Sequence, residues 1–287
     1  MHLGSVELGH IRVDVIDGGA VWMDGGTIFG VVPKPLWSEV SKPDGDNRVR
    51  LSFLSLLVRT EEATIVIEGG SAAHQPPKMR EHFKADDSRL LETLSSVGVE
   101  ADDVDFFIPS HLHFDHVGGA TTPNGGAPVF PAAQYVIQKA EWQEANNPMG
   151  INRNAYIPGD IGPLHSARLL LVDGAANIVP GVSVAKTGGH SVGHQMVKVG
   201  ERAGEMLLFV GDIIPMSQHM NPRWTCAFDL FPVDTYNVKM DILTRAVNEG
   251  VFIAPGHGGH APICTVNRTS KGQYVAQRLP CIAEPES

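Results

Sequence analysis

The segment "PSHLHFDHVGG" (109–119) places three histidines and one aspartate within six consecutive positions. His111, His113, Asp115 and His116 directly follow the apolar run "VDFFI" (104–108), which is typical of a buried strand. Imidazole and carboxylate groups in the pattern H-x-H-x-D-H indicate a metal site, and a histidine-rich polar loop is the alternative. The choice between the two depends on the rest of the chain.

Three other segments repeat the order of an apolar strand, a glycine turn and a histidine or aspartate, namely "VAKTGGHSVGH" (184–194), "LLFVGD" (207–212) and "VFIAPGHGG" (251–259). Ligands of α/β proteins bind beyond the carboxyl ends of strands, so four such loops at one sheet edge would bring their polar groups together. The residues expected to meet there are His111, His113, Asp115, His116, His190, Asp212 and His257.

This set exceeds the four ligands of one tetrahedral zinc ion, and it fits two divalent metal ions that share a bridging ligand. Its ligands are imidazoles and carboxylates without cysteine. Such a set favours Zn, Mn, Fe or Co in a hydrolytic role over a closed structural zinc site. We therefore expect two divalent metal ions as cofactors, with zinc as the first choice.

The composition limits the partners of the chain. The 287 residues carry a formal net charge of −10, and the pI is near 5.7. Such a surface repels nucleic-acid phosphates and anionic lipid headgroups, so neither a nucleic acid nor a membrane is expected as a partner. Three widely spaced cysteines without a C-x-x-C pair, and an N-terminus without a leader pattern, predict a cytoplasmic protein.

Short β-like runs bounded by glycine or charge alternate with helical patterns. Strands are predicted over 11–23, 51–58, 63–70, 104–110, 133–138, 181–190, 195–200, 204–212 and 251–259. Helices are predicted over 87–98, where Asp87 or Ser88 would provide the cap, and over 139–147 and 233–250. Two halves of strands followed by a helix predict one α/β domain over 1–287, in which two packed sheets are flanked by helices.

Residues 23–47 differ from the rest because they mix glycine and proline with scattered large apolar side chains. We expect a long ordered loop there. It could cover the active site or a second copy of the chain, so a homodimer is kept as a candidate assembly.

The ligand pattern resembles the metallo-β-lactamase superfamily. The resemblance implies an αββα sandwich of two mixed sheets flanked by helices, with a dinuclear site. It also implies that His111, His113 and His190 hold one metal, that Asp115, His116 and His257 hold the other, and that Asp212 bridges them. The β-lactamases of this fold commonly have Arg in place of His116 and Cys in place of Asp212, and the diiron branch has Glu in place of His113.

These departures favour the dinuclear hydrolases. The stretches "MDGGTIFGVVPKPLW" (23–37), "GDIIP" (211–215) and "AFDLFPVDT" (227–235) resemble the quorum-quenching N-acyl homoserine lactonase branch, which has methyl-parathion-hydrolase-like relatives. The resemblance implies a lactonase that opens lactones or esters by attack of metal-activated hydroxide, with Asp212 and Asp115 as catalytic carboxylates. The alternatives are a phosphotriesterase and a metal-binding protein without turnover.

The substrate is expected to be a small molecule with an apolar portion. The candidate pocket residues lie in loops near the ligand motifs, and they are Phe29, Phe114, Met216, His219, Trp224 and Phe228. Glu68 stands where the family usually has an aspartate that supports a ligand. For His194, four residues after His190, we expect a structural role.

Overall fold

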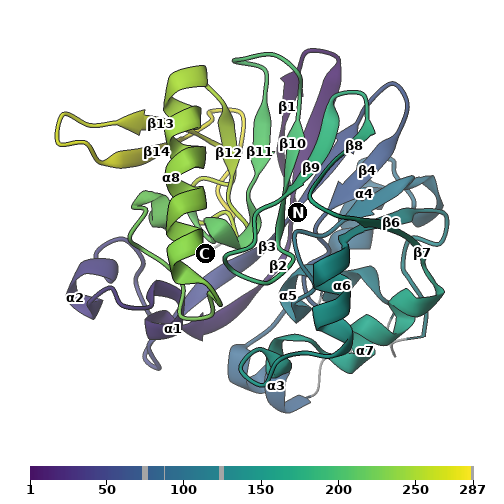
Figure 1. The fold of residues 1–287 in the computed structure, drawn as a ribbon, viewed down its shortest axis with the longest axis horizontal. Coiled ribbons are helices and arrows are strands. Elements are labelled where there is room, and N and C mark those ends of the chain that lie inside the picture. The colour runs from purple at the N-terminus through teal and green to yellow at the C-terminus, as the bar shows by residue number, and fades with distance from the viewer. Residues whose placement is uncertain (73–76, 87, 123–125, 286–287) are drawn as a thin grey trace.

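The computed structural model describes residues 1–72, 77–86, 88–122 and 126–285. Two seven-stranded sheets lie face to face, one in the order β1-β2-β3-β4-β5-β6-β7 and the other in the order β14-β13-β12-β11-β10-β9-β8. Figure 1 shows helices beside both sheets. This arrangement confirms the predicted αββα sandwich.

The strands of the first sheet are β1 (His2–Leu8), β2 (Ile11–Asp24), β3 (Arg48–Arg59), β4 (Thr64–Ile67), β5 (Phe106–Ile108), β6 (Gln134–Gln138) and β7 (Arg168–Val172). Those of the second sheet are β8 (Ala175–Val179), β9 (Val182–Lys186), β10 (Gln195–Val199), β11 (Leu207–Phe209), β12 (Phe252–Ala254), β13 (Cys264–Arg268) and β14 (Tyr274–Arg278). The α-helices are α1 (Gly25–Phe29), α2 (Lys34–Trp37), α3 (Pro77–Phe83), α4 (Leu90–Ser96), α5 (Phe114–Val117), α6 (Lys139–Asn146), α7 (Pro158–Ile161) and α8 (Pro232–Glu249).

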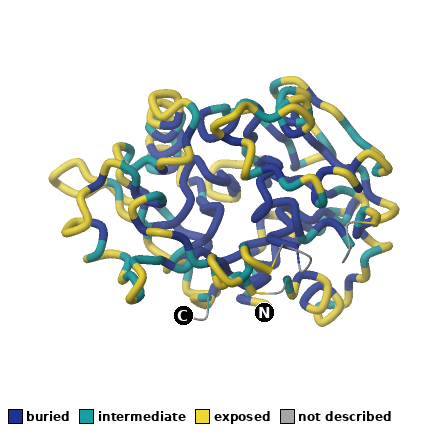
Figure 2. Tube along the Cα trace, turned by 90° about the horizontal axis from the view of Figure 1, so that it is seen from below, coloured by how far each residue is buried: buried dark blue, intermediate teal, exposed yellow. Residues whose placement is uncertain are grey.

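Alternation along the strands sends neighbouring side chains into different cores. On β3, Leu56 packs into the cluster between the two sheets, whereas Leu57 packs into a second cluster beneath α4. Helix α8 buries Thr235, Lys239, Ile242, Leu243 and Ala246 at helical spacing, and it covers the outer face of the second sheet. Figure 2 shows the buried residues along the central strands, with exposed residues mainly in the surrounding loops and helices.

Two parallel strand pairs determine where the polar loops meet. Strand β4 pairs in parallel with β5, and β11 pairs in parallel with β12. The segments that follow these strands therefore leave the sheets at shared edges. Glu68 follows β4 and His111 follows β5, while Asp212 follows β11 and His257 follows β12.

The structure differs from the sequence predictions in several elements, and helices α3, α5 and α7 were not predicted. Residues 23–47 contain the end of β2 and the short helices α1 and α2, so the segment is not a loop throughout. Strands β1, β7, β8, β13 and β14 were not predicted. Helix α4 begins at Leu90, later than expected; Asp87 lies outside the described residues, and the Ser88 hydroxyl accepts a hydrogen bond from the Leu90 N–H at 3.4 Å.

A search of the described helices finds none with the length and apolar character needed to cross a membrane.

Candidate active site

All seven predicted ligand residues meet at one edge of the sandwich. His111 and His113 lie in the turn after β5, and α5 begins one residue later and carries Asp115 and His116. His190 lies between β9 and β10, Asp212 follows β11, and His257 follows β12. Every one of these residues is buried, and the most exposed is Asp115 at 8%.

The first group of donor atoms combines three imidazoles with one carboxylate oxygen. His113 Nδ1 lies 2.9 Å from His111 Nε2 and 3.2 Å from His190 Nε2. Asp212 Oδ2 lies 3.4 Å from His190 Nε2. A tetrahedral zinc with Zn–N bonds of about 2.0–2.1 Å separates its donors by about 3.3 Å, so this spacing suits a single cation.

The second group faces the other oxygen of the same aspartate. Asp212 Oδ1 lies 3.5 Å from His116 Nε2 and 3.4 Å from His257 Nε2. Asp115 Oδ2 lies 3.7 Å from His257 Nε2. Asp212 thus presents one oxygen to each group, which is the geometry of a bridging carboxylate.

Unpartnered polar atoms indicate that this cluster suits cations. His116 Nε2, His257 Nε2 and Asp212 Oδ1 are buried without a hydrogen-bond partner. A buried polar group without a partner costs about 1–3 kcal/mol. Trios of these side chains bring donor atoms within 4.8 Å of one another, as metal ligands must. The donor set and the unpartnered atoms together fit divalent metals.

The electrostatics of the site give its groups different protonation states. Burial, with His116 and other imidazoles close by, holds the pKa of His111 well below its usual range. Burial opposes ionisation of Asp212, but His116 and His257 outweigh it and hold the pKa of that carboxyl well below its usual range. Against the effect of burial, Asp212 in turn raises the pKa of His116 and of His190 above the usual range. A cation bound at these two rings would therefore take the place of a proton.

A ring of outer contacts fixes the ligand orientations. The Glu68 carboxylate lies 2.7 Å from His116 Nδ1 and accepts a hydrogen bond from the Ser110 N–H at 2.5 Å. Its backbone has a φ of 67°, an uncommon conformation for a residue other than glycine. Asp229 Oδ1 lies 2.8 Å from His190 Nδ1. Such partners set which ring nitrogen faces a metal.

Further contacts around the ligands involve the Ser52 carbonyl and the His194 side chain. The Ser52 carbonyl lies 3.0 Å from His257 Nδ1. His194 Nε2 accepts a hydrogen bond from the Asp212 N–H at 3.1 Å, and its Nδ1 lies 2.6 Å from the Thr187 hydroxyl. Through its two ring nitrogens His194 thus connects the Asp212 backbone to the Thr187 side chain.

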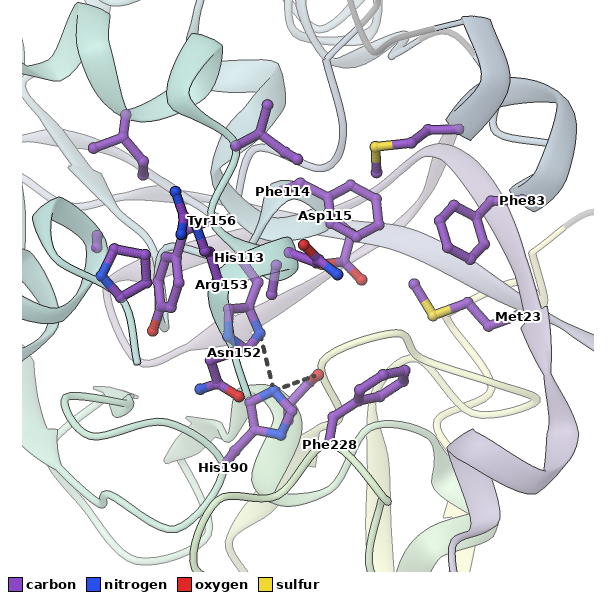
Figure 3. A pocket seen from close by; sticks show the side chains of 18 of the residues that line it. Met23, Phe83, His113, Phe114, Asp115, Asn152, Arg153, Tyr156, His190 and Phe228 are labelled. Atoms are coloured by element: carbon purple, nitrogen blue, oxygen red, sulfur yellow. Dashed lines mark hydrogen bonds and ion pairs between the residues drawn. The ribbon is translucent and has the colours of Figure 1, made fainter. Parts of the chain in front are cut away.

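A cavity of about 1010 Å³ opens onto the ligand cluster, and His113, Asp115, His190, Asp212 and His257 all contribute to its wall. Figure 3 shows Met23, Phe83, Phe114 and Phe228 gathered on one side of it. Asn152, Arg153 and Tyr156 lie on the other side. The cavity thus joins a metal-ligating base to one apolar and one polar wall.

Of the six candidate pocket residues, Phe114 and Phe228 line this cavity. Phe29, Met216, His219 and Trp224 are absent from its described lining. Phe29 stacks on His219 with ring centroids 4.7 Å apart and meets the edge of Trp224 at 5.8 Å. These side chains pack against one another and not against the cavity. Nearness to a ligand motif in the sequence does not determine the direction of a side chain.

Several residues that the structure places at or near the site were not predicted from the sequence. Met23 and Phe83 line the cavity from β2 and α3. Asp229 lies in an apolar stretch, and an acidic residue there was a signal of a buried contact. Glu141 is only 1% exposed, on helix α6. The sequence of this helix is typical of a surface helix, so it contained no signal that Glu141 would be buried.

Comparison with known families decides the assignment. The family model described as the metallo-beta-lactamase superfamily matches residues 52–257. The chain belongs to the metallo-β-lactamase superfamily. The match spans the segments that carry all seven ligand residues and Glu68, and it confirms the family predicted from the H-x-H-x-D-H pattern.

Individual relatives fall within the same family. An N-acyl homoserine lactonase of Bacillus cereus is 32% identical over 181 residues, which are 57% of this chain and 65% of that protein. The alignment thus spans just under two thirds of that relative. AttM of Azorhizobium caulinodans, also named N-acyl homoserine lactonase, is 24% identical over 70% of this chain and 80% of its own.

Solved structures agree on the fold. A probable metal-dependent hydrolase from Staphylococcus aureus superposes with a TM-score of 0.87 at 27% identity, over 96% of this chain and 99% of its own. AidC, a dizinc quorum-quenching lactonase solved with N-hexanoyl-L-homoserine, superposes with a TM-score of 0.80 at 18% identity, over 96% and 97% of the two chains. At that identity, the second likeness concerns the fold alone.

Proposed function

We propose that this superfamily member is a metal-dependent hydrolase that opens N-acyl homoserine lactones or closely related lactones and esters. The observation that carries the proposal is the cavity, in which an apolar wall ends on a cluster of metal-ligating groups. The names of the Bacillus and Azorhizobium relatives support the lactone as substrate. Quorum quenching and a cytoplasmic location remain part of the proposal.

In this proposal seven side chains hold two divalent cations, with zinc as the first choice. His111, His113 and His190 form one group, Asp115, His116 and His257 form the other, and Asp212 lies between them. Two such cations, when bound, lower the pKa of water and polarise a carbonyl oxygen.

The two carboxylates are the proposed catalytic residues because both reach the cavity wall. Asp212 is held ionised by the surrounding imidazoles. In the proposal, its free carboxylate lone pairs accept a proton from the attacking water and pass it to the ring oxygen as the lactone C–O bond breaks. Asp115 lies beside Phe114 and faces the same space.

The apolar wall is proposed to bind the acyl chain. Phe114 is 7% exposed and stacks against Phe83 with ring centroids 6.0 Å apart. Met23 and Phe228 extend this surface on the same side of the cavity. An alkyl chain laid on these side chains loses contact with water while its carbonyl reaches the ligand cluster.

A homodimer is also kept as a proposal. Val31 and Leu36, in the segment that contains α1 and α2, are 85% and 53% exposed. Burial of such side chains against a second copy would remove apolar surface from water.

A substrate panel tests the proposed function. The zinc-loaded protein is assayed on homoserine lactones, aryl esters, phosphotriesters and β-lactams, with Asp212→Ala as the control. We expect lactone opening to have the highest kcat/KM and to be lost in the variant. Rapid turnover of phosphotriesters without activity on any lactone would overturn the lactonase assignment, and inactivity on the whole panel would favour a metal-binding protein without turnover.

A further inference from the structure

Glu141 is a buried carboxylate with four hydrogen-bond donors around it. It lies on α6 and is 1% exposed. Its Oε1 accepts from the Leu112 N–H at 3.0 Å and from the Tyr156 hydroxyl at 3.0 Å. Its Oε2 accepts from the Ser191 hydroxyl at 2.6 Å and from the Gly193 N–H at 3.0 Å.

Three of these donors, all but Tyr156, belong to the two loops that carry the first ligand group. Leu112 lies between His111 and His113, and Ser191 directly follows His190. The second loop also packs closely on α6, because a Cβ added at Gly193 would meet the Glu141 backbone nitrogen at 2.2 Å. One side chain thus connects two segments that are separated by about 80 positions of the chain.

The donor pattern requires a carboxylate. The two hydroxyls can rotate to accept a hydrogen bond, but the N–H groups of Leu112 and Gly193 can only donate. A glutamine here would turn its NH₂ toward one of these N–H groups in either orientation, and that group would lose its partner. Burial, with the Glu141 carboxylate beside the phenol, raises the pKa of Tyr156, which therefore remains a donor.

We infer that Glu141 is a positioning residue for the first ligand group, setting the separation of the loops that carry His111, His113 and His190. This inference rests on the proposed metal-dependent function. The Glu68 carboxylate differs in that it contacts a ring of the second group directly, at His116, and it also accepts from the Ser110 N–H beside His111. Its direct ring contact lies in the second group, whereas Glu141 contacts the two loops of the first.

Tyr156 extends this support to the substrate cavity. Its hydroxyl donates to Glu141, its ring meets the edge of His113 with centroids 4.9 Å apart, and its side chain lines the cavity. The polar wall is thereby attached to the first ligand group.

Zinc binding tests this inference, with Glu68→Gln as the matched control for Glu141→Gln. The wild type and both variants are labelled with ¹⁵N in histidine, stripped with a chelator and titrated with Zn²⁺. Imidazole nitrogen shifts then report which rings bind. We expect Glu141→Gln to weaken zinc binding at His111, His113 and His190 by roughly 10–100-fold, with a smaller effect at His116 and His257, and Glu68→Gln to reverse this order.

Milder variants keep the test decisive if Glu141→Gln does not fold. Ser191→Ala and Tyr156→Phe each remove one donor without leaving an N–H unpaired, and each should weaken the same three rings by a few-fold. Wild-type zinc affinity at these rings in the folded variants, or a loss confined to His116 and His257, would overturn the inference alone. A wild-type protein whose seven ligands bind no zinc would instead overturn the proposed function, and the inference with it.

Discussion

Replacing Phe114 with alanine should reduce the preference for long acyl chains more than it slows the shortest lactone. Phe114 lines the cavity next to Asp115 and packs on Phe83. Complete burial of one methylene contributes about 0.8 kcal/mol, which corresponds to a factor of about four in kcat/KM. The cavity wall covers only part of a bound chain, so we expect about twofold per methylene in the wild type. In Phe114→Ala, the factor by which kcat/KM rises for each added methylene should approach one.

The assay is a series of homoserine lactones from N-butanoyl to N-decanoyl, with kcat/KM measured for each. Phe130→Leu is the control, because Phe130 is a fully buried ring in a cluster beneath the first sheet and does not line the cavity. This control should retain the wild-type dependence on chain length. An unchanged slope in Phe114→Ala, or an equal loss of slope in both variants, would refute the assignment of Phe114 to the acyl-binding wall.

Further predictions concern the ligands, their supports and one buried lysine. His113→Ala and Asp212→Ala should each abolish lactone hydrolysis while circular dichroism remains close to that of the wild type, because both residues lie beyond strand ends. Asp229→Asn should weaken zinc binding by roughly 10–100-fold in competition with a chelating dye, since Asp229 orients His190; unchanged affinity would contradict that role. Burial lowers the pKa of Lys239 to about 8 from 10.5, so between these values the unfolded chain binds the additional proton. The unfolding free energy, measured in guanidinium, should therefore increase with pH between 8 and 10.5 in the wild type relative to Lys239→Met. The difference between the two proteins should change by up to about 3 kcal/mol. A difference that does not change with pH would contradict the lowered pKa of Lys239.

The meeting of the seven candidate ligands could be predicted because each follows an apolar strand in the same order of residues. The sequence thus contained both the chemistry of His190, Asp212 and His257 and their place beyond strand ends. The central strands could be predicted for a related reason, since β2 and β3 bury nearly all of their side chains and read as long apolar runs.

The cavity wall and the supporting carboxylates could not be predicted in the same way. Trp224 and Phe228 lie in one loop, yet only Phe228 reaches the cavity, and that difference depends on tertiary packing. Glu141 is separated by 50 positions from Ser191, whose hydroxyl it binds. Strand β8 keeps all its residues partly or fully exposed, and its sequence AANIV has no clear apolar face. Strand β7, in contrast, was missed although its sequence RLLLV is a short apolar run.

A zinc titration of the chelator-treated protein, with bound metal and lactone opening recorded together, tests the dinuclear hydrolase most directly. The bridging position of Asp212 between two donor groups predicts that activity on an N-acyl homoserine lactone reaches its maximum only when two zinc ions are bound per chain. Full activity with one zinc ion per chain, or with none, would contradict it.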